Sequence, residues 1–133
     1  MKYTELKKKH SDEFGDFKGI FYAFNDKQFN EGMEKIGLLK NEKDKIYSIG
    51  FGGFILKERN DEFVDMISRH SKELYSMLED KDFLLDALVY ELINHEYCIS
   101  YDANTALYVL GLSSESVDKD ILKEACRKSL ERS

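Results

Sequence analysis

Residues 82–102, DFLLDALVYELINHEYCISYD, decide the fold of this chain. In the first half of this stretch, apolar residues recur at the spacing of a helix and cover most of its circumference, which predicts a buried helix. The residues in this pattern are Phe83, Leu84, Ala87, Leu88, Leu92 and Ile93. In the second half, Tyr97, Ile99 and Tyr101 alternate with Cys98 and Ser100, which is the pattern of a strand. We therefore expect a buried helix that leads into a strand through residues 94–96.

The remaining elements are expected to pack around this helix. Strands are predicted at residues 19–24, 46–49 and 54–56, and further helices at residues 4–16, 25–37, 60–78, 103–110 and 117–132. The helix at residues 60–78 and the buried helix are close in sequence, so they form a helical hairpin. The sequence thus predicts an α+β fold, with a small antiparallel sheet of three to four strands packed against this hairpin and further short helices.

Length and composition limit the classes of protein to which this chain can belong. The chain has 133 residues, 42% of them hydrophobic, which is enough for a single compact domain over residues 1–133. The formal net charge of −6 argues against a general phosphate-backbone binder, since such proteins present a basic face. Two cysteines form neither a disulfide framework nor a zinc set. The apolar runs are too short for a membrane span or a secretion signal, so we expect a cytosolic protein.

A glycine-rich segment, Gly50-Phe51-Gly52-Gly53, joins two of the predicted strands. A phosphate-binding loop leads from a strand into a helix, whereas this segment leads into another strand-like run, and no Gly-Lys-Ser or Gly-Lys-Thr follows. The segment therefore favours a hairpin turn or a bulge. A ligand-binding loop that uses Gly50, Gly52 and Gly53 is the alternative, because glycine permits close backbone approach.

Ionisable residues gather where the central helix ends. Glu91 and His95 are four residues apart and share one helix face, and Glu96 is adjacent. A carboxylate and an imidazole supply two metal ligands, yet a metal site needs three or four. We therefore predict no metal site and no catalytic set, and the simpler interpretation is helix termination with these side chains bonding local backbone groups. The candidate binding residues at this junction are Asn94, His95, Glu96 and Tyr97.

A further histidine and the strand aromatics are also candidates for binding. His70 lies on the apolar side of the helix at residues 60–78, where a core position is the default and a functional role, including convergence with His95, is the alternative. Aromatics on strands occur in single-strand nucleic-acid binders, but the basic groove of such proteins is missing here. We therefore expect core packing for Phe21, Tyr22, Phe24, Tyr47, Phe51, Phe54, Tyr97 and Tyr101, and no direct nucleic-acid binding.

Several short segments carry a resemblance to known sequences. They are residues 21–24 (FYAF), 28–32 (QFNEG), 48–53 (SIGFGG), 69–70 (RH) and 90–99 (YELINHEYCI). In these segments the chain resembles a family of small uncharacterised proteins found in phages, prophages and gut bacteria. The resemblance covers roughly residues 17–112. It implies a genomic setting and no biochemical activity.

The leading functional hypothesis is a non-enzymatic accessory protein of phage type that binds a host protein in the bacterial cytosol and uses no cofactor. By analogy with other small acidic phage proteins, its action is inhibition of a host defence system, in the manner of an anti-CRISPR or signal-sequestering protein. The alternative is a small metal-assisted hydrolase or nucleotide-binding protein that uses Glu91, His95 and Glu96. A homodimer is left open as the oligomeric state.

Overall fold

The computed structural model describes all 133 residues and contains seven α-helices and one three-stranded antiparallel sheet, which confirms the predicted α+β class. The chain divides into two compact units. Met1–Ser11 and His70–Ser133 form the first, here called the helical unit, and Asp12–Arg69 forms the second, the sheet unit. The helices α1 (Tyr3–Asp16) and α3 (Asn60–Met77) contribute residues to both units. This division does not test the expectation of a single compact domain over residues 1–133, which stays a prediction. No helix combines the length and the apolar character needed to cross a membrane.

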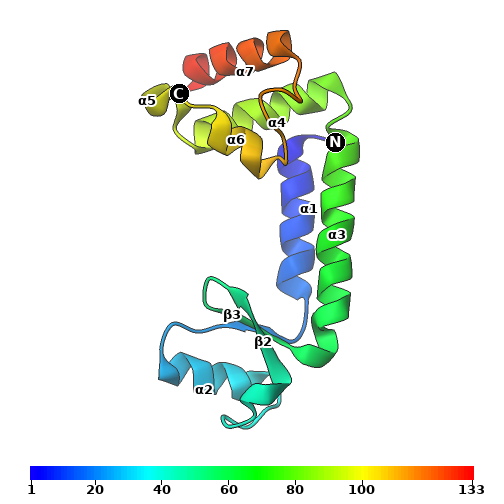
Figure 1. Ribbon diagram of the computed structural model, residues 1–133, viewed down its shortest axis with the longest axis vertical. Helices are drawn as coiled ribbons and strands as arrows, with labels where there is room; N and C mark the ends of the chain where they lie inside the picture. The colour runs from blue at the N-terminus through cyan, green and yellow to red at the C-terminus, as the bar shows by residue number, and fades with distance from the viewer. The chain divides into compact units, whose positions relative to one another are not determined.

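The helical unit is built around α4 (Lys81–Asn94), the helix predicted to be buried. In Figure 1, α4 lies between α6 (Asn104–Val109) and α7 (Lys119–Arg132), and it packs on both. The side chain of Asp80 begins α4 by accepting hydrogen bonds from amides of the first turn at 2.9 and 3.0 Å. The buried core of this unit consists of Tyr3, Leu6, Leu78, Phe83, Ala87, Leu88, Val89, Leu92, Ala106, Leu107, Leu110, Val117 and Ala125.

The strand predicted at residues 97–101 is wrong. This segment forms a short helix, α5 (Tyr97–Ser100), flanked by two left-handed residues, Glu96 at φ 58° and Tyr101 at φ 54°. The Glu96 carbonyl accepts hydrogen bonds from amides of the following turn, which closes the helix. An alternating pattern of this length also fits one helical turn. A strand in addition requires a neighbouring strand for its backbone groups, and all the strands of this protein lie in the sheet unit.

The sheet unit contains three strands in the order β1 (Ile20–Tyr22), β3 (Gly53–Leu56) and β2 (Ile46–Gly50), all antiparallel (Figure 1). The strands β2 and β3 form the hairpin expected from the glycine-rich segment, and β1 pairs with the other side of β3. A register shift interrupts the pairing of β2 near its end. The central strand is therefore β3, and the sheet has β1 and β2 at its edges.

The helix that packs on the sheet within this unit is α2 (Asp26–Lys35), which was predicted at residues 25–37, whereas the prediction placed the helical hairpin against the sheet. Asn25 caps α2, because its side chain accepts a hydrogen bond from the Gln28 amide at 2.8 Å. Gly32 lets the helix approach the sheet closely, since a Cβ at this position would come within 2.1 Å of the Phe21 ring. The core cluster of the unit consists of Phe21, Ala23, Met33 and Ile46, with Phe29, Ile36, Leu38 and Phe54 packed against it.

Candidate functional site

Glu91, on α4, is a buried carboxylate with three partners in the helical unit. Its Oε1 accepts hydrogen bonds from the Tyr3 hydroxyl at 2.9 Å and the Lys7 ammonium at 3.0 Å, and the His95 Nε2 lies 3.3 Å from its Oε2. The same ammonium lies over the rings of Tyr3 and Tyr90. Burial and the hydrogen bond to Glu91 together raise the pKa of the Tyr3 phenol. This group of side chains, the Glu91 cluster, joins α1 to α4.

Burial limits the chemistry open to the Glu91 cluster. The Glu91 side chain is 1% exposed, while those of Lys7 and His95 are 41% and 30% exposed. Oε2 of Glu91 makes no hydrogen bond, and a protonated His95 is placed to form an ion pair with it. No group of three or more His, Cys, Asp or Glu side chains is arranged to hold a metal ion. The geometry therefore supports an ion pair between helices better than acid–base chemistry on a substrate.

The other candidate residues of the junction lie outside the Glu91 cluster. Asn94 and Glu96 are exposed, whereas Tyr97 packs against the hydrophobic core. The Cys126 side chain next to Tyr97 raises the pKa of the Tyr97 phenol. None of these side chains takes part in the hydrogen bonds of the buried carboxylate, so the junction residues are not brought together as one group.

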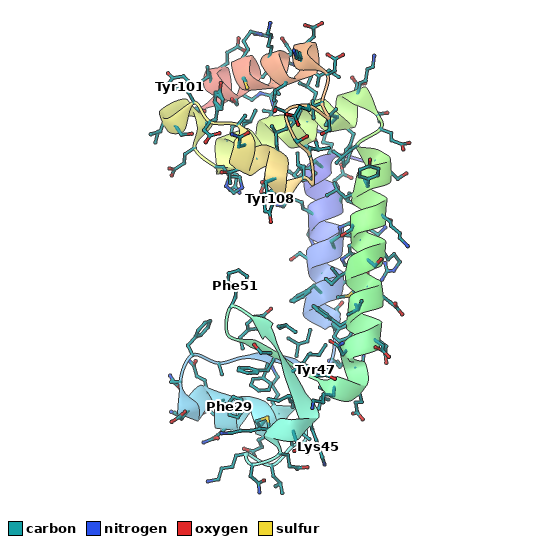
Figure 2. The ribbon with its side chains drawn as sticks, viewed as in Figure 1. Phe29, Lys45, Tyr47, Phe51, Tyr101 and Tyr108 are labelled. Carbon is teal, nitrogen blue, oxygen red and sulfur yellow. The ribbon has the colours of Figure 1, made fainter.

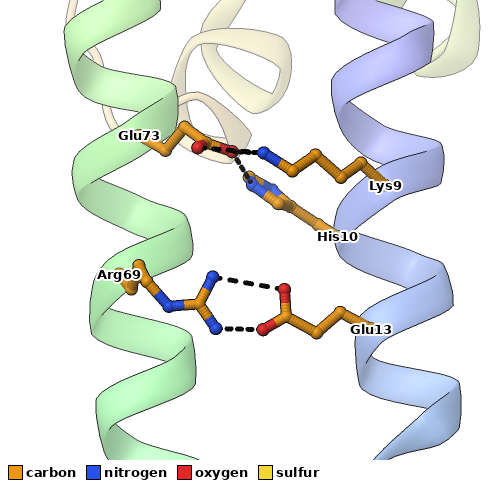
Figure 3. A network of polar contacts seen from close by, with 5 residues as sticks. All are labelled: Lys9, His10, Glu13, Arg69 and Glu73. Atoms are coloured by element: carbon orange, nitrogen blue, oxygen red, sulfur yellow. Dashed lines mark hydrogen bonds and ion pairs between the residues drawn. The ribbon is translucent and has the colours of Figure 1, made fainter.

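His70 belongs to a different cluster of the helical unit. Its ring stacks on that of His10, with centroids 4.0 Å apart and an interplanar angle of 12°. The His10 Nε2 lies 2.8 Å from Oε1 of Glu73, and the Lys9 ammonium reaches the same oxygen at 3.1 Å (Figure 3). The contact with His10, followed by that with Lys9, lowers the pKa of Glu73. His70 and His95 thus have different partners, and the role of His10 was missed because only tertiary structure brings it to His70.

The glycine-rich segment forms the turn of the β2–β3 hairpin, as predicted. Its two central residues, Phe51 and Gly52, have φ angles of 53° and 79°, the left-handed geometry of a type I′ turn. A Cβ at Gly52 would lie 2.5 Å from the Phe24 ring, and one at Gly53 would lie 2.7 Å from the Ile49 side chain. The predicted loop residues Gly50, Gly52 and Gly53 all lie in or beside this turn. Turn geometry and close side-chain packing explain glycine at these positions.

The sheet unit exposes four aromatic side chains, Tyr22, Phe24, Tyr47 and Phe51, which we together call the aromatic surface. Their exposed fractions are 48%, 77%, 46% and 97%. Tyr22 and Tyr47 lie on one face of the sheet, because the β3 residues opposite them are two positions apart. Figure 2 shows Phe51 projecting from the tip of the hairpin. This surface is the strongest candidate for binding.

The expectation that the strand aromatics pack in the core is correct for only part of the set. Phe21 is buried and stacks on Phe54 with ring centroids 5.3 Å apart, but the aromatic surface and Tyr101 are exposed. Composition alone could not separate the two groups, because successive strand residues face opposite sides. One signal was present in the sequence: Phe51 lies between glycines at the expected turn, and a residue at a turn tip has little to pack against.

Comparison with known proteins identifies one family. The sequence profile described as “Family of unknown function (DUF7659)” matches residues 2–132. The match confirms the expected membership of an uncharacterised family. No curated protein and no solved structure matches the chain. The functional argument therefore depends on the geometry of the exposed and buried side chains.

Proposed function

We propose that this chain, which belongs to the family of unknown function DUF7659, is a binding protein whose aromatic surface docks onto a protein partner. The proposal rests on the exposure and the backbone conformation of Phe51. Its side chain is 97% exposed and its φ is 53°, at a turn position where asparagine or glycine is favoured. The left-handed conformation costs a residue of this kind about 1–2 kcal/mol. Phenylalanine therefore weakens the isolated fold here without gaining burial, and a partner supplies the burial.

The chemistry of the aromatic surface fits a protein partner. Tyrosine and phenylalanine are enriched at the centres of protein interfaces, where their rings fill pockets of the partner. Near Tyr47, the Lys57 ammonium lies 5.0 Å from the ring centre and adds a positive group to a largely apolar surface. The net charge of −6 supports a protein rather than a nucleic acid as the partner.

In its full form, the proposal places the chain in a bacterial cytosol, where it binds a host protein and inhibits a host defence system as a phage-type accessory protein. The small size, the acidic charge and the resemblance to phage and prophage sequences support this role. The alternative, a metal-assisted hydrolase at the Glu91 cluster, receives less support because the carboxylate is buried and already bonded to Tyr3 and Lys7.

Phe51→Asn tests the proposal, because asparagine suits the turn while the ring is lost. The tagged wild-type chain and the variant are used to capture proteins from bacterial lysate, and the captured proteins are compared by quantitative mass spectrometry. We expect a specific protein that the wild type recovers and the variant recovers at about one tenth of that level or less, since hot-spot aromatics contribute 2 kcal/mol or more.

A matched control comes from the helical unit. Tyr108 is 83% exposed on α6, so Tyr108→Asn removes a similarly exposed ring outside the aromatic surface. This control should recover the same protein at the wild-type level. Equal recovery by Phe51→Asn, or selective loss in Tyr108→Asn, would contradict the assignment of binding to the sheet unit.

A further inference from the structure

A groove of about 500 Å³ in the sheet unit is lined by the connection from β1 to α2, including Phe24, and by residues of α2, β2 and β3. Its apolar lining includes Phe29, Ile46 and Phe54, and the two rings meet edge to face with centroids 5.2 Å apart. Ser48, an exposed residue of β2, also lines the groove. The groove therefore offers the rings of Phe29 and Phe54 next to the backbone of β2, an edge strand.

The outer side of β2 is free for backbone pairing. In the sheet order β1-β3-β2, β2 pairs only with β3, so the backbone groups on its other side have no strand partner. The register shift between Ser48 and Gly50 interrupts the regular edge, which leaves Ile46 to Ser48 as its straight part. An added strand would thus be short, and its side chains on one face would enter the groove.

The charge at the groove is positive on one side. The Lys43 ammonium lies 5.6 Å from the centre of the Phe29 ring and forms no ion pair, whereas the nearby Lys45 is paired with Glu42. The carboxylate that lines the groove, Asp26, lies in the first turn of α2, where the helix dipole stabilises its charge. The lining thus carries one charge of each sign, and Lys43 is the charged group that lies over an aromatic ring of the groove.

We infer that the groove takes a short extended segment of a partner protein in which an aromatic side chain stands next to a carboxylate. The segment pairs its backbone with the free edge of β2, its ring packs on Phe29 and Phe54, and its carboxylate binds the Lys43 ammonium. This inference rests on the proposed function, because it names the chemistry of the partner that the sheet unit binds.

The test uses two fluorescein-labelled peptides, acetyl-Glu-Phe-Glu-Phe-Glu and acetyl-Lys-Phe-Lys-Phe-Lys, and fluorescence anisotropy at physiological salt, which screens the net charge of −6 more than it screens a short ion pair. The wild type should bind the acidic peptide about tenfold more tightly than the basic one, as expected for a short ion pair beside an apolar contact. Lys43→Glu should reverse this preference. Because Lys43 is exposed, the substitution leaves the core intact.

Lys40→Glu is the matched control, since it changes the net charge equally at an exposed lysine that does not line the groove. This variant should keep the wild-type preference within about twofold. Equal binding of the two peptides by the wild type, or an equal effect of both substitutions, would overturn the inference. So would a wild-type dimer, seen in sedimentation, that Lys43→Glu dissociates, because a second copy would then occupy the groove.

The peptide result and the capture result with Phe51→Asn are separable. Loss of peptide discrimination together with Phe51-dependent capture removes the groove assignment and leaves the proposed function standing. Peptide discrimination without Phe51-dependent capture keeps the groove as a binding site and removes the docking role of the hairpin tip.

Discussion

In the helical unit, aliphatic side chains from helices far apart in sequence form the larger core cluster, and Glu91 is buried beside them. In the sheet unit, the core cluster is smaller, and Phe54 has Phe21 and Phe29 as ring neighbours at 5.3 and 5.2 Å. The sheet unit also keeps Phe51 almost fully exposed. Burial and ion pairing therefore account for most residues of the helical unit, whereas the sheet unit holds residues, Phe51 above all, that stability alone does not explain.

The largest effect should come from Glu91→Ala in the helical unit. The substitution removes the acceptor of the Tyr3 hydroxyl and the Lys7 ammonium and leaves a cavity beside α4. We expect the free energy of unfolding to fall by about 3 kcal/mol. Urea denaturation measures the total loss, and hydrogen exchange with mass spectrometry reports which peptides become less protected.

Glu79→Ala is the control for this experiment, because Glu79 is exposed in the same unit and should change stability by less than about 0.5 kcal/mol. In Glu91→Ala, exchange should rise in peptides of the helical unit while those of the sheet unit stay protected. An equal rise in peptides 20–56 would contradict the contrast between the two units and support cooperative unfolding of residues 1–133 as a single domain.

How much of the fold could be predicted depended on how local its cause was. The helix α4 was predictable because its apolar spacing and its Asp80 cap lie within one stretch. The hydrogen bond from the Tyr3 hydroxyl to Glu91 was not predictable, because the two residues are 88 positions apart in the sequence. Residues 97–101 were assigned wrongly because alternation describes the side chains and says nothing of whether a second strand is near enough to pair.

In the sheet unit, Gly32→Ala should have the next largest effect. A Cβ at this position would lie 2.1 Å from the Phe21 ring, so the ring or the helix α2 must move. Overpacking of this kind costs about 1–3 kcal/mol, and we expect a loss of about 2 kcal/mol. Urea denaturation measures it, and hydrogen exchange should show reduced protection in α2 and β1 first.

Gly15→Ala serves as the matched control in the same unit. Gly15 lies in α1, and a Cβ there has no heavy atom within 4 Å. Alanine should therefore raise the stability by about 0.5–1 kcal/mol, because it favours the helix more than glycine does. Destabilisation by both substitutions would show that the contact with Phe21 is not the cause.

Phe51→Asn should raise the stability of the sheet unit while it removes binding. Asparagine adopts the left-handed conformation at φ 53° more readily than phenylalanine, so the free energy of unfolding should rise by about 1 kcal/mol. Leu39→Asn, which replaces an exposed apolar residue without a positive φ, should leave stability unchanged. A fall in stability with Phe51→Asn would indicate that the ring contributes to the fold, which would weaken its assignment to a partner.

Of the candidate site, the turn was predicted from the sequence and the exposed aromatic side chains were not. The glycine-rich segment indicated a turn, and that turn is where the exposed Phe51 lies. The exposure of Tyr22 and Tyr47 could not be predicted, because it depends on the register of β1 and β2 against β3. The groove depends on that register and on the packing of α2, so no local sequence pattern predicted it.

The smallest effect is expected for Glu73→Gln in the helical unit, and it should depend on pH. The folded chain lowers the pKa of Glu73 through His10 and Lys9, so the carboxylate stabilises the fold at neutral pH and loses this contribution as the pH falls below the ordinary range of a glutamate side chain and through the lowered folded pKa. The stability difference between wild type and Glu73→Gln, measured by urea denaturation, should therefore be present at pH 6 and shrink towards pH 3. Glu79→Gln, exposed in the same unit, should show no such trend. A difference that stays constant across this range would mean that the interaction of Glu73 with His10 and Lys9 does not depend on the charge of the carboxylate.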